Sequence, residues 1–129
     1  MNARTDPRQA LGRAGEELAT RHLESRGFEI LARCAQTAQG ELDVVAFGDQ
    51  TIVFVEVKTR RVGVRGDHAA DPLESIGPRK RARLRRAGAA WLSAHRDRPR
   101  ARRIRFDAIS VTIDGVGRVR ALEHVCDAF

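Results

Sequence analysis

The sequence predicts a mixed α/β fold, in which a mixed β-sheet is flanked by helices. Two segments with apolar residues at helical spacing alternate with runs of strand-forming residues, in the order α-β-β-β-α-β-β. The chain has 129 residues, of which 42% are hydrophobic and 32% are charged. This length and composition suit one compact domain, and we expect a single domain over residues 1–129.

The first helix is predicted to begin at residues 5–7, where Thr-Asp-Pro supplies a capping side chain and an early proline. Gly27 is typical of a helix end. At about 100° per residue, Glu17 points away from the apolar face of this helix, whereas Glu16 lies at the margin of that face. We therefore expect Glu17 to be solvated and Glu16 to reach toward whatever the helix packs against.

Val, Ile and Phe are frequent in the three strands that are predicted to follow the first helix. These strands are residues 28–33, 40–47 and 51–59. Residues 48–50, with the sequence Gly-Asp-Gln, favour a hairpin turn between the second and the third of them.

The second half of the chain is predicted to hold one more helix and two more strands. Residues 61–72 show no periodicity and are expected to form a mobile loop. The second helix is predicted from about residue 76 to about residue 95, followed by strands at residues 103–111 and 119–125.

The formal net charge of +7 favours an anionic partner, and nucleic acid is the first candidate. A general bias toward arginine would give the same composition. The arginines are dense in residues 79–86 and again in residues 96–105.

The cellular compartment is expected to be the cytoplasm. No apolar run approaches the roughly 20 residues that a membrane span needs, and the N-terminus lacks the apolar core of a signal peptide. Cys34 and Cys126 are too few and too far apart to indicate a disulfide framework or a zinc cluster, so we expect buried or idle thiols. His22 is interpreted as a packed core residue, and His124 shows no partner at metal-ligand spacing.

Four charged residues interrupt the apolar pattern of the second and third strands. Side chains alternate along a strand, so Glu41 and Asp43 share one face, and Glu56 and Lys58 share a face on the next strand. If the hairpin loop has an even number of residues, counting back from the turn sets Asp43 opposite Glu56. Glu41 then faces Lys58, and all four groups gather far from the turn, whereas an odd loop would separate the two sets.

Two carboxylates directly opposite each other repel, and they destabilise the strand pair unless a cation lies between them. Mg²⁺ (or Mn²⁺) fits such a place, because it takes oxygen ligands from carboxylates, water and substrate phosphate. Lys58 can orient a water molecule and stabilise charge on a phosphate. Lys80 falls on the core-facing stripe of the second helix and is expected to point into the same site. The alternatives are an ion pair at a strand end and, for Lys80, an ammonium group directed to solvent.

The order of Glu16, Asp43 and Glu56-Val57-Lys58 resembles the PD-(D/E)xK nuclease pattern. More closely, the chain resembles the YraN-like family, bacterial proteins related in fold to archaeal Holliday junction resolvases. The matching segments cover most of the chain: GRAGEELATRHLESRGFEIL, GELDVVAF, VFVEVKTR, the helix with the second lysine, RFDAISV and the closing Ala-Phe.

The resemblance implies a restriction-endonuclease-like α/β core and a metal-dependent active site. It implies that Asp43 and Glu56 are metal ligands, joined by the backbone carbonyl of Val57. It also implies that Lys58 is the catalytic lysine and that Glu16 completes the site, directly or through water.

Further site residues also follow from the family pattern. Glu41 and Lys80 match typical positions, with Glu41 as an accessory residue. Nucleic-acid contacts are expected from Lys80, Arg60 and Arg105, and the density of arginines in the second helix adds Arg79 and Arg83. After the first strand, family members often carry an Asn followed by an Arg. In this chain, residues 33–36 have the sequence Arg-Cys-Ala-Gln, which includes Cys34.

These expectations describe a divalent-metal-dependent, endonuclease-like protein that binds nucleic acid, with DNA as the expected partner and branched or structured DNA as the candidate substrate. The candidate activity is that of a magnesium-dependent phosphodiesterase. The alternatives are a non-catalytic module that binds nucleic acid or a partner protein, and a structural protein with surface ion pairs. A resolvase-like role would favour a homodimer, because symmetric junctions suit symmetric enzymes.

Overall fold

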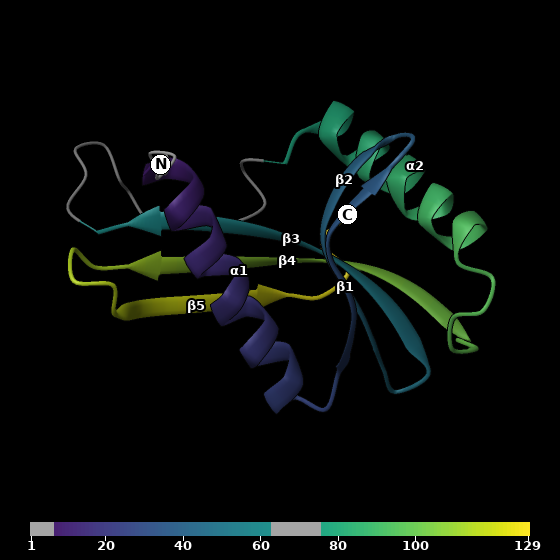
Figure 1. Ribbon diagram of the computed structural model, residues 1–129, viewed down its shortest axis with the longest axis horizontal. Helices are drawn as coiled ribbons and strands as arrows, with labels where there is room; N and C mark the ends of the chain where they lie inside the picture. Colours follow the sequence, from purple (N-terminus) through teal and green to yellow (C-terminus); the bar gives the residue numbers. More distant parts are fainter. Residues whose placement is uncertain (1–6, 63–75) are drawn as a thin grey trace, which may run out of the picture.

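The computed structural model describes residues 7–62 and 76–129, which form a five-stranded mixed sheet and two helices (Figure 1). The elements are α1 (Pro7–Ser25), β1 (Glu29–Thr37), β2 (Gly40–Gly48), β3 (Thr51–Arg61), α2 (Pro78–Ala94), β4 (Arg103–Ile113) and β5 (Val119–Val125). Their order confirms the predicted fold class. In this part of the chain, neither helix is long and apolar enough to cross a membrane.

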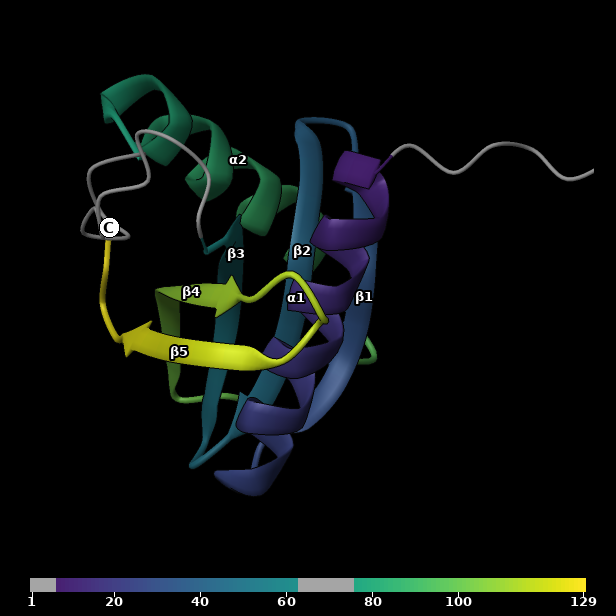
Figure 2. The same cartoon turned by 90° about the vertical axis from the view of Figure 1, so that its left-hand side faces the viewer.

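The five strands lie in the spatial order β1-β2-β3-β4-β5. Only β3 and β4 are parallel, and α2 belongs to the connection between them. All other neighbours are antiparallel. The sheet is twisted, so that β5 crosses the direction of β1 in Figure 2.

Each helix covers a separate apolar cluster of the sheet. Leu84 and Trp91 of α2 belong to the cluster that contains Phe54. Leu23 of α1 belongs to the cluster that contains Val53. Because Val53 and Phe54 are consecutive on β3, their side chains point to opposite faces, and the two helices lie on opposite sides of the sheet.

Several strands extend beyond the ends that their apolar patterns predict. β1 reaches Thr37 and β3 reaches Arg61, past the predicted ends at residues 33 and 59. Backbone pairing with β2 and β4 continues through these polar residues, which the hydrophobic pattern cannot reveal. The expected loop therefore starts later than predicted, and most of it, residues 63–72, lies outside the described residues.

The turn between β2 and β3 sets the register on which the candidate site depends. Asp49 and Gln50 have φ angles of 48° and 57°, as a two-residue hairpin with a type I′ turn requires. Phe47 pairs with Ile52, as an even loop predicts. The described pairing of the two strands ends at Val44 and Val55, directly before the acidic residues.

Helix α1 approaches β3 unusually closely at Gly15. A Cβ atom at this position would overlap the side chain of Thr59. The absence of a side chain thus allows the helix to lie directly on β3. The next residue, Glu16, is thereby held next to the ends of the paired β2 and β3 segments.

Replacing Gly15 by Ala should destabilise the protein relative to Gly12→Ala, because the new methyl group would overlap Thr59. Gly12 lies on the same helix, and a Cβ there meets no atom within 4 Å, so both variants gain the same helix propensity. We expect the free energy of unfolding, measured by urea denaturation, to be lower in Gly15→Ala by about 1–3 kcal/mol. Equal values in the two variants would show that α1 does not depend on this contact.

Candidate functional site

A cavity of about 420 Å³ lies at the place where the pairing of β2 and β3 ends. Both helices and both strands contribute to its lining. The residues that line it include Glu16, Asp43, Glu56, Val57, Lys58 and Lys80. All the predicted catalytic and metal-binding residues, together with Lys80, therefore meet in one cavity.

Asp43 is the most perturbed titratable group of this cavity. Burial, followed by the negative charge of Glu56, raises the pKa of Asp43 to about 7, and the charge of Glu16 adds to the effect. The backbone N–H of Val57 donates to Asp43 Oδ2 at 2.9 Å, which opposes part of this rise. The repulsion that the register predicts between Asp43 and Glu56 is thus present.

Glu56 has a cationic partner, which is Lys80 of α2. The distance from Lys80 Nζ to Glu56 Oε1 is 2.8 Å, and the Glu56 side chain is only 13% exposed. Lys80 therefore points into the cavity, as one of the two alternatives predicts, and its ammonium group is not directed to solvent. Lys58, two residues after Glu56, is an exposed residue that also lines the cavity.

Cys34 extends the acidic cluster in a way that the sequence did not indicate. Its Sγ donates to Glu16 Oε2 at 3.0 Å. This hydrogen bond, together with burial and the charge of Glu16, raises the pKa of the Cys34 thiol to about 12. The thiol is thus protonated at neutral pH and orients Glu16. Both cysteines are exposed, so the expectation of buried or idle thiols was wrong as to burial.

Glu41 lies outside the residues that line the cavity. It pairs with Gln36 across β1 and β2, and Gln36 Nε2 donates to Glu41 Oε2 at 3.1 Å. The predicted opposition of Glu41 and Lys58 was wrong, because the described pairing of β2 and β3 ends before it reaches them.

Glu17 lies where the helical periodicity predicts, directed away from the cavity. Arg33 Nη2 lies 2.8 Å from Glu17 Oε2, and Arg21 lies one helical turn further along α1. The hydrogen bond from Arg33 lowers the pKa of Glu17. Glu17 is therefore an ionised surface group, and it offers a matched control for Glu16.

The arginines proposed to contact nucleic acid lie in different places. Arg79 is exposed in the first turn of α2, and Arg83 lies against Gly40 of the β1–β2 hairpin. Arg60 belongs to β3. Arg105 lies on β4, where its Nε and Nη2 atoms each donate to the buried carboxylate of Asp107 at 2.9 Å. Two donors of Arg105 are thus occupied within the protein.

His22 and His124 lie 102 positions apart in the sequence and contact each other in the structure. His22 Nε2 and His124 Nδ1 are 3.1 Å apart, and His124 Nε2 lies 2.7 Å from Asp107 Oδ2. His22 is half-buried, not a core residue. Sequence spacing could not reveal this pair, because it depends on the packing of α1 against the sheet.

Replacing Cys34 by Asn should stabilise the protein. Cys34 has a φ angle of 47°, in the left-handed region that Asn tolerates better than other side chains. The Asn amide also keeps a donor for Glu16. We expect the free energy of unfolding in urea to rise by about 0.5–1 kcal/mol. Cys34→Ala, which keeps the strained backbone and loses the donor, is the control and should not be stabilised.

The raised pKa of Asp43 predicts a pH-dependent effect of Asp43→Asn. A carboxyl group whose pKa is higher in the folded than in the unfolded state loses stability as the pH rises from about 4 to about 7. In the metal-free protein, Asn should therefore stabilise the fold at pH 8, by about 1 kcal/mol or more, and much less at pH 4.5. Urea denaturation at both pH values measures this difference. An equal effect at both would mean that Asp43 titrates normally.

Relatives of this chain are found in several bacteria. It is 50% identical over 95 residues to a UPF0102 protein of Acidothermus cellulolyticus, covering 74% of this chain and 69% of the relative. A UPF0102 protein of Parafrankia sp. is 46% identical over 121 residues, or 94% of this chain and 97% of the relative. A UPF0102 protein of Nocardia farcinica is 48% identical over 127 residues, which cover 98% of this chain and 94% of the relative.

The family described as "Uncharacterised protein family UPF0102" matches residues 15–111, which include Glu16, Asp43, Glu56 and Lys58. This match covers more than half of the chain, and the relatives extend it almost to both ends. The resemblance to the YraN-like family is thereby confirmed. The chain belongs to the UPF0102 family, the YraN-like members of the PD-(D/E)xK nuclease-like superfamily.

Proposed function

We propose that this protein is a divalent-metal-dependent endonuclease that acts on DNA, with branched or structured DNA as its substrate. The observation that carries the proposal is the meeting of Glu16, Asp43, Glu56 and Lys58 in one cavity. Structural ion pairs at a strand end would not need a third carboxylate from a helix on the other side of the sheet.

The oxygen atoms of the cavity fit Mg²⁺ or Mn²⁺. Asp43 and Glu56 would hold the ion with their carboxylates, and Val57, between Glu56 and Lys58, would add its backbone carbonyl. The raised pKa of Asp43 supports this fit, because two neighbouring carboxylates without a cation keep one of them partly protonated. When bound, the ion would supply Lewis-acid activation of the scissile phosphate.

The side chains of the cavity have distinct tasks in this proposal. Lys58 orients the attacking water and stabilises the negative charge that develops on the phosphate. Glu16, held by the Cys34 thiol, would accept a hydrogen bond from a water molecule in the same cavity. Lys80 neutralises Glu56 while no substrate is bound, and its ammonium group, which lines the cavity, would contact a bound phosphate.

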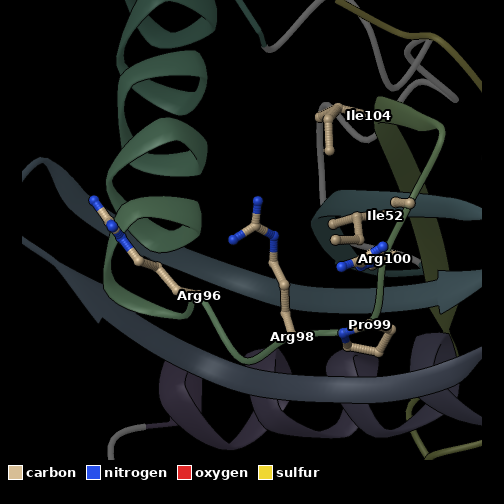
Figure 3. Close-up of a pocket in the computed structure, with 7 residues that line it drawn as sticks. Ile52, Arg96, Arg98, Pro99, Arg100 and Ile104 are labelled. Atoms are coloured by element: carbon tan, nitrogen blue, oxygen red, sulfur yellow. The ribbon is translucent and has the colours of Figure 1, made fainter.

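A second basic region offers a place for the nucleic-acid backbone beyond the cavity. Arg96, Arg98 and Arg100 line a pocket of about 270 Å³ with Ile52 and Ile104, along the connection from α2 to β4 (Figure 3). Arg98 Nη1 donates to backbone carbonyls at the end of α2, so it holds the turn. Arg96 and Arg100 are exposed and suit phosphate contacts.

The separation of this pocket from the acidic cavity fits a long substrate. Lys80, near the start of α2, lines the acidic cavity, and α2 ends at Ala94, two residues before Arg96 of the arginine-lined pocket. At about 1.5 Å per residue, the helix between them spans about 21 Å, or about six base-pair steps of 3.4 Å. Together with the net charge of +7, this spacing favours DNA over a small phosphate ester.

A non-catalytic module that binds DNA is the second candidate. The observation that favours it is the ion pair of Glu56 with Lys80, which satisfies Glu56 without any metal. Such a module would bind DNA in a salt-dependent manner and would leave it intact.

The proposal predicts cleavage of DNA that depends on Mg²⁺ or Mn²⁺. The purified protein is given labelled linear, single-stranded, flapped and four-way-junction DNA with either metal. We expect Asp43→Asn, Glu56→Gln and Lys58→Ala to reduce the cleavage rate at least about 100-fold, because each removes a metal ligand or the group that stabilises the developing charge. Binding of DNA, measured by fluorescence anisotropy in Ca²⁺, should remain.

Glu17→Gln is the matched control for these variants, because Glu17 is a carboxylate of α1 that points away from the cavity. Its cleavage rate should equal that of the wild type. Cleavage by Asp43→Asn at the wild-type rate would contradict the mechanism. Binding without cleavage in the wild type would favour the non-catalytic module.

A further inference from the structure

A second group of metal-ligating side chains lies apart from the acidic cavity. Asp107 of β4, His124 of β5 and Cys126 offer ligand atoms that all lie within 4.8 Å of one another. None of the three lines the cavity. Asp107 pairs with Val55 across β4 and β3, so it points to the face opposite Glu56, the next residue of β3.

We propose that Asp107, His124 and Cys126 form a zinc site. In a tetrahedral site with bonds of about 2.0–2.3 Å, neighbouring ligand atoms lie about 3.3–3.7 Å apart. Here His124 Nε2 lies 2.7 Å from Asp107 Oδ2 and 3.8 Å from Cys126 Sγ. Side-chain shifts of less than 1 Å bring both distances into the required range, and Cys126 is exposed and free to make such a shift.

The donor set selects zinc and not magnesium. One imidazole nitrogen, one thiolate and one carboxylate oxygen suit a borderline-soft ion, whereas Mg²⁺ requires oxygen ligands in octahedral geometry. The exposed side of the site leaves the fourth position to water.

The groups around these ligands are arranged as metal sites require. His22 Nε2 lies 3.1 Å from His124 Nδ1, so it can accept the proton of His124 Nδ1 and leave Nε2 for the metal. Arg105 and the backbone N–H of Asp127 donate to Asp107 and fix its carboxylate. Asp107 is completely buried, which leaves it little freedom to turn away.

A bound ion would reinforce contacts that already join parts of the fold at this point, where His124 and the backbone N–H of Asp127 both contact Asp107. Asp107 and His124 come from neighbouring strands, and Cys126 lies in the C-terminal segment. Through His22 the site also touches α1, the helix that carries Glu16. Zinc binding to the folded state would thus stabilise the C-terminal segment and the helix by mass action.

Cobalt(II) is a suitable probe, because it takes the same ligands as zinc and absorbs strongly in the near ultraviolet when it is bound to a thiolate. The reduced, metal-free protein is titrated with Co²⁺. We expect one equivalent to bind with a thiolate–cobalt absorption band, which Zn²⁺ displaces and millimolar Mg²⁺ does not. Cys126→Ser should lose the band, and His22→Phe should weaken binding about 10- to 100-fold.

Two controls assign the band to this site. Cys34→Ser removes the other exposed thiol and should keep the band, since Cys34 lies at the acidic cavity. Asp43→Asn should also keep it, so the result does not depend on the proposed nuclease function. Absence of the band in the wild type, or its persistence in Cys126→Ser, would overturn the zinc site. Cys126→Ser changes one exposed atom, and circular dichroism verifies its fold.

Discussion

The repulsion between Asp43 and Glu56 is the interaction on which the rest of this structure depends. Two carboxylates face each other where the pairing of β2 and β3 ends, and burial makes their repulsion stronger than it would be in water. The fold limits this repulsion in three ways. The raised pKa of Asp43 keeps its carboxyl group partly protonated at neutral pH, and the backbone N–H of Val57 donates to the same group. Lys80 pairs with Glu56.

The backbone holds the two carboxylates in place through features far from them. The two-residue turn at Asp49 and Gln50 fixes the register, and a change of one residue would send one of the acidic side chains to the other face. The close approach of α1 to β3 at Gly15 then brings Glu16 to the same place. The site is therefore assembled from a turn, a helix contact and a strand end, each of which has its own sequence requirement.

The sequence predicted the features that depend on local periodicity. Alternation along β2 and β3 and the length of the turn were enough to set Asp43 near Glu56, and helical periodicity separated Glu16 from Glu17. The features that depend on packing were not predictable. The hydrogen bond of Cys34 with Glu16 joins residues on β1 and α1, and the contact of His124 with Asp107 joins two strands. The predicted position of Glu41, opposite Lys58, was wrong because periodicity cannot show where two strands separate.

Titrating Mn²⁺ into the metal-free protein in a calorimeter at pH 7.5 tests directly whether Asp43 and Glu56 hold a cation. The cation account predicts one binding site whose affinity falls at least about tenfold in Glu56→Gln, because a carboxylate ligand of the ion is lost. Glu17→Gln, with its carboxylate outside the cavity, should bind Mn²⁺ as the wild type does. Equal Mn²⁺ affinity in Glu56→Gln and the wild type would show that the paired carboxylates hold no metal, and would contradict the account.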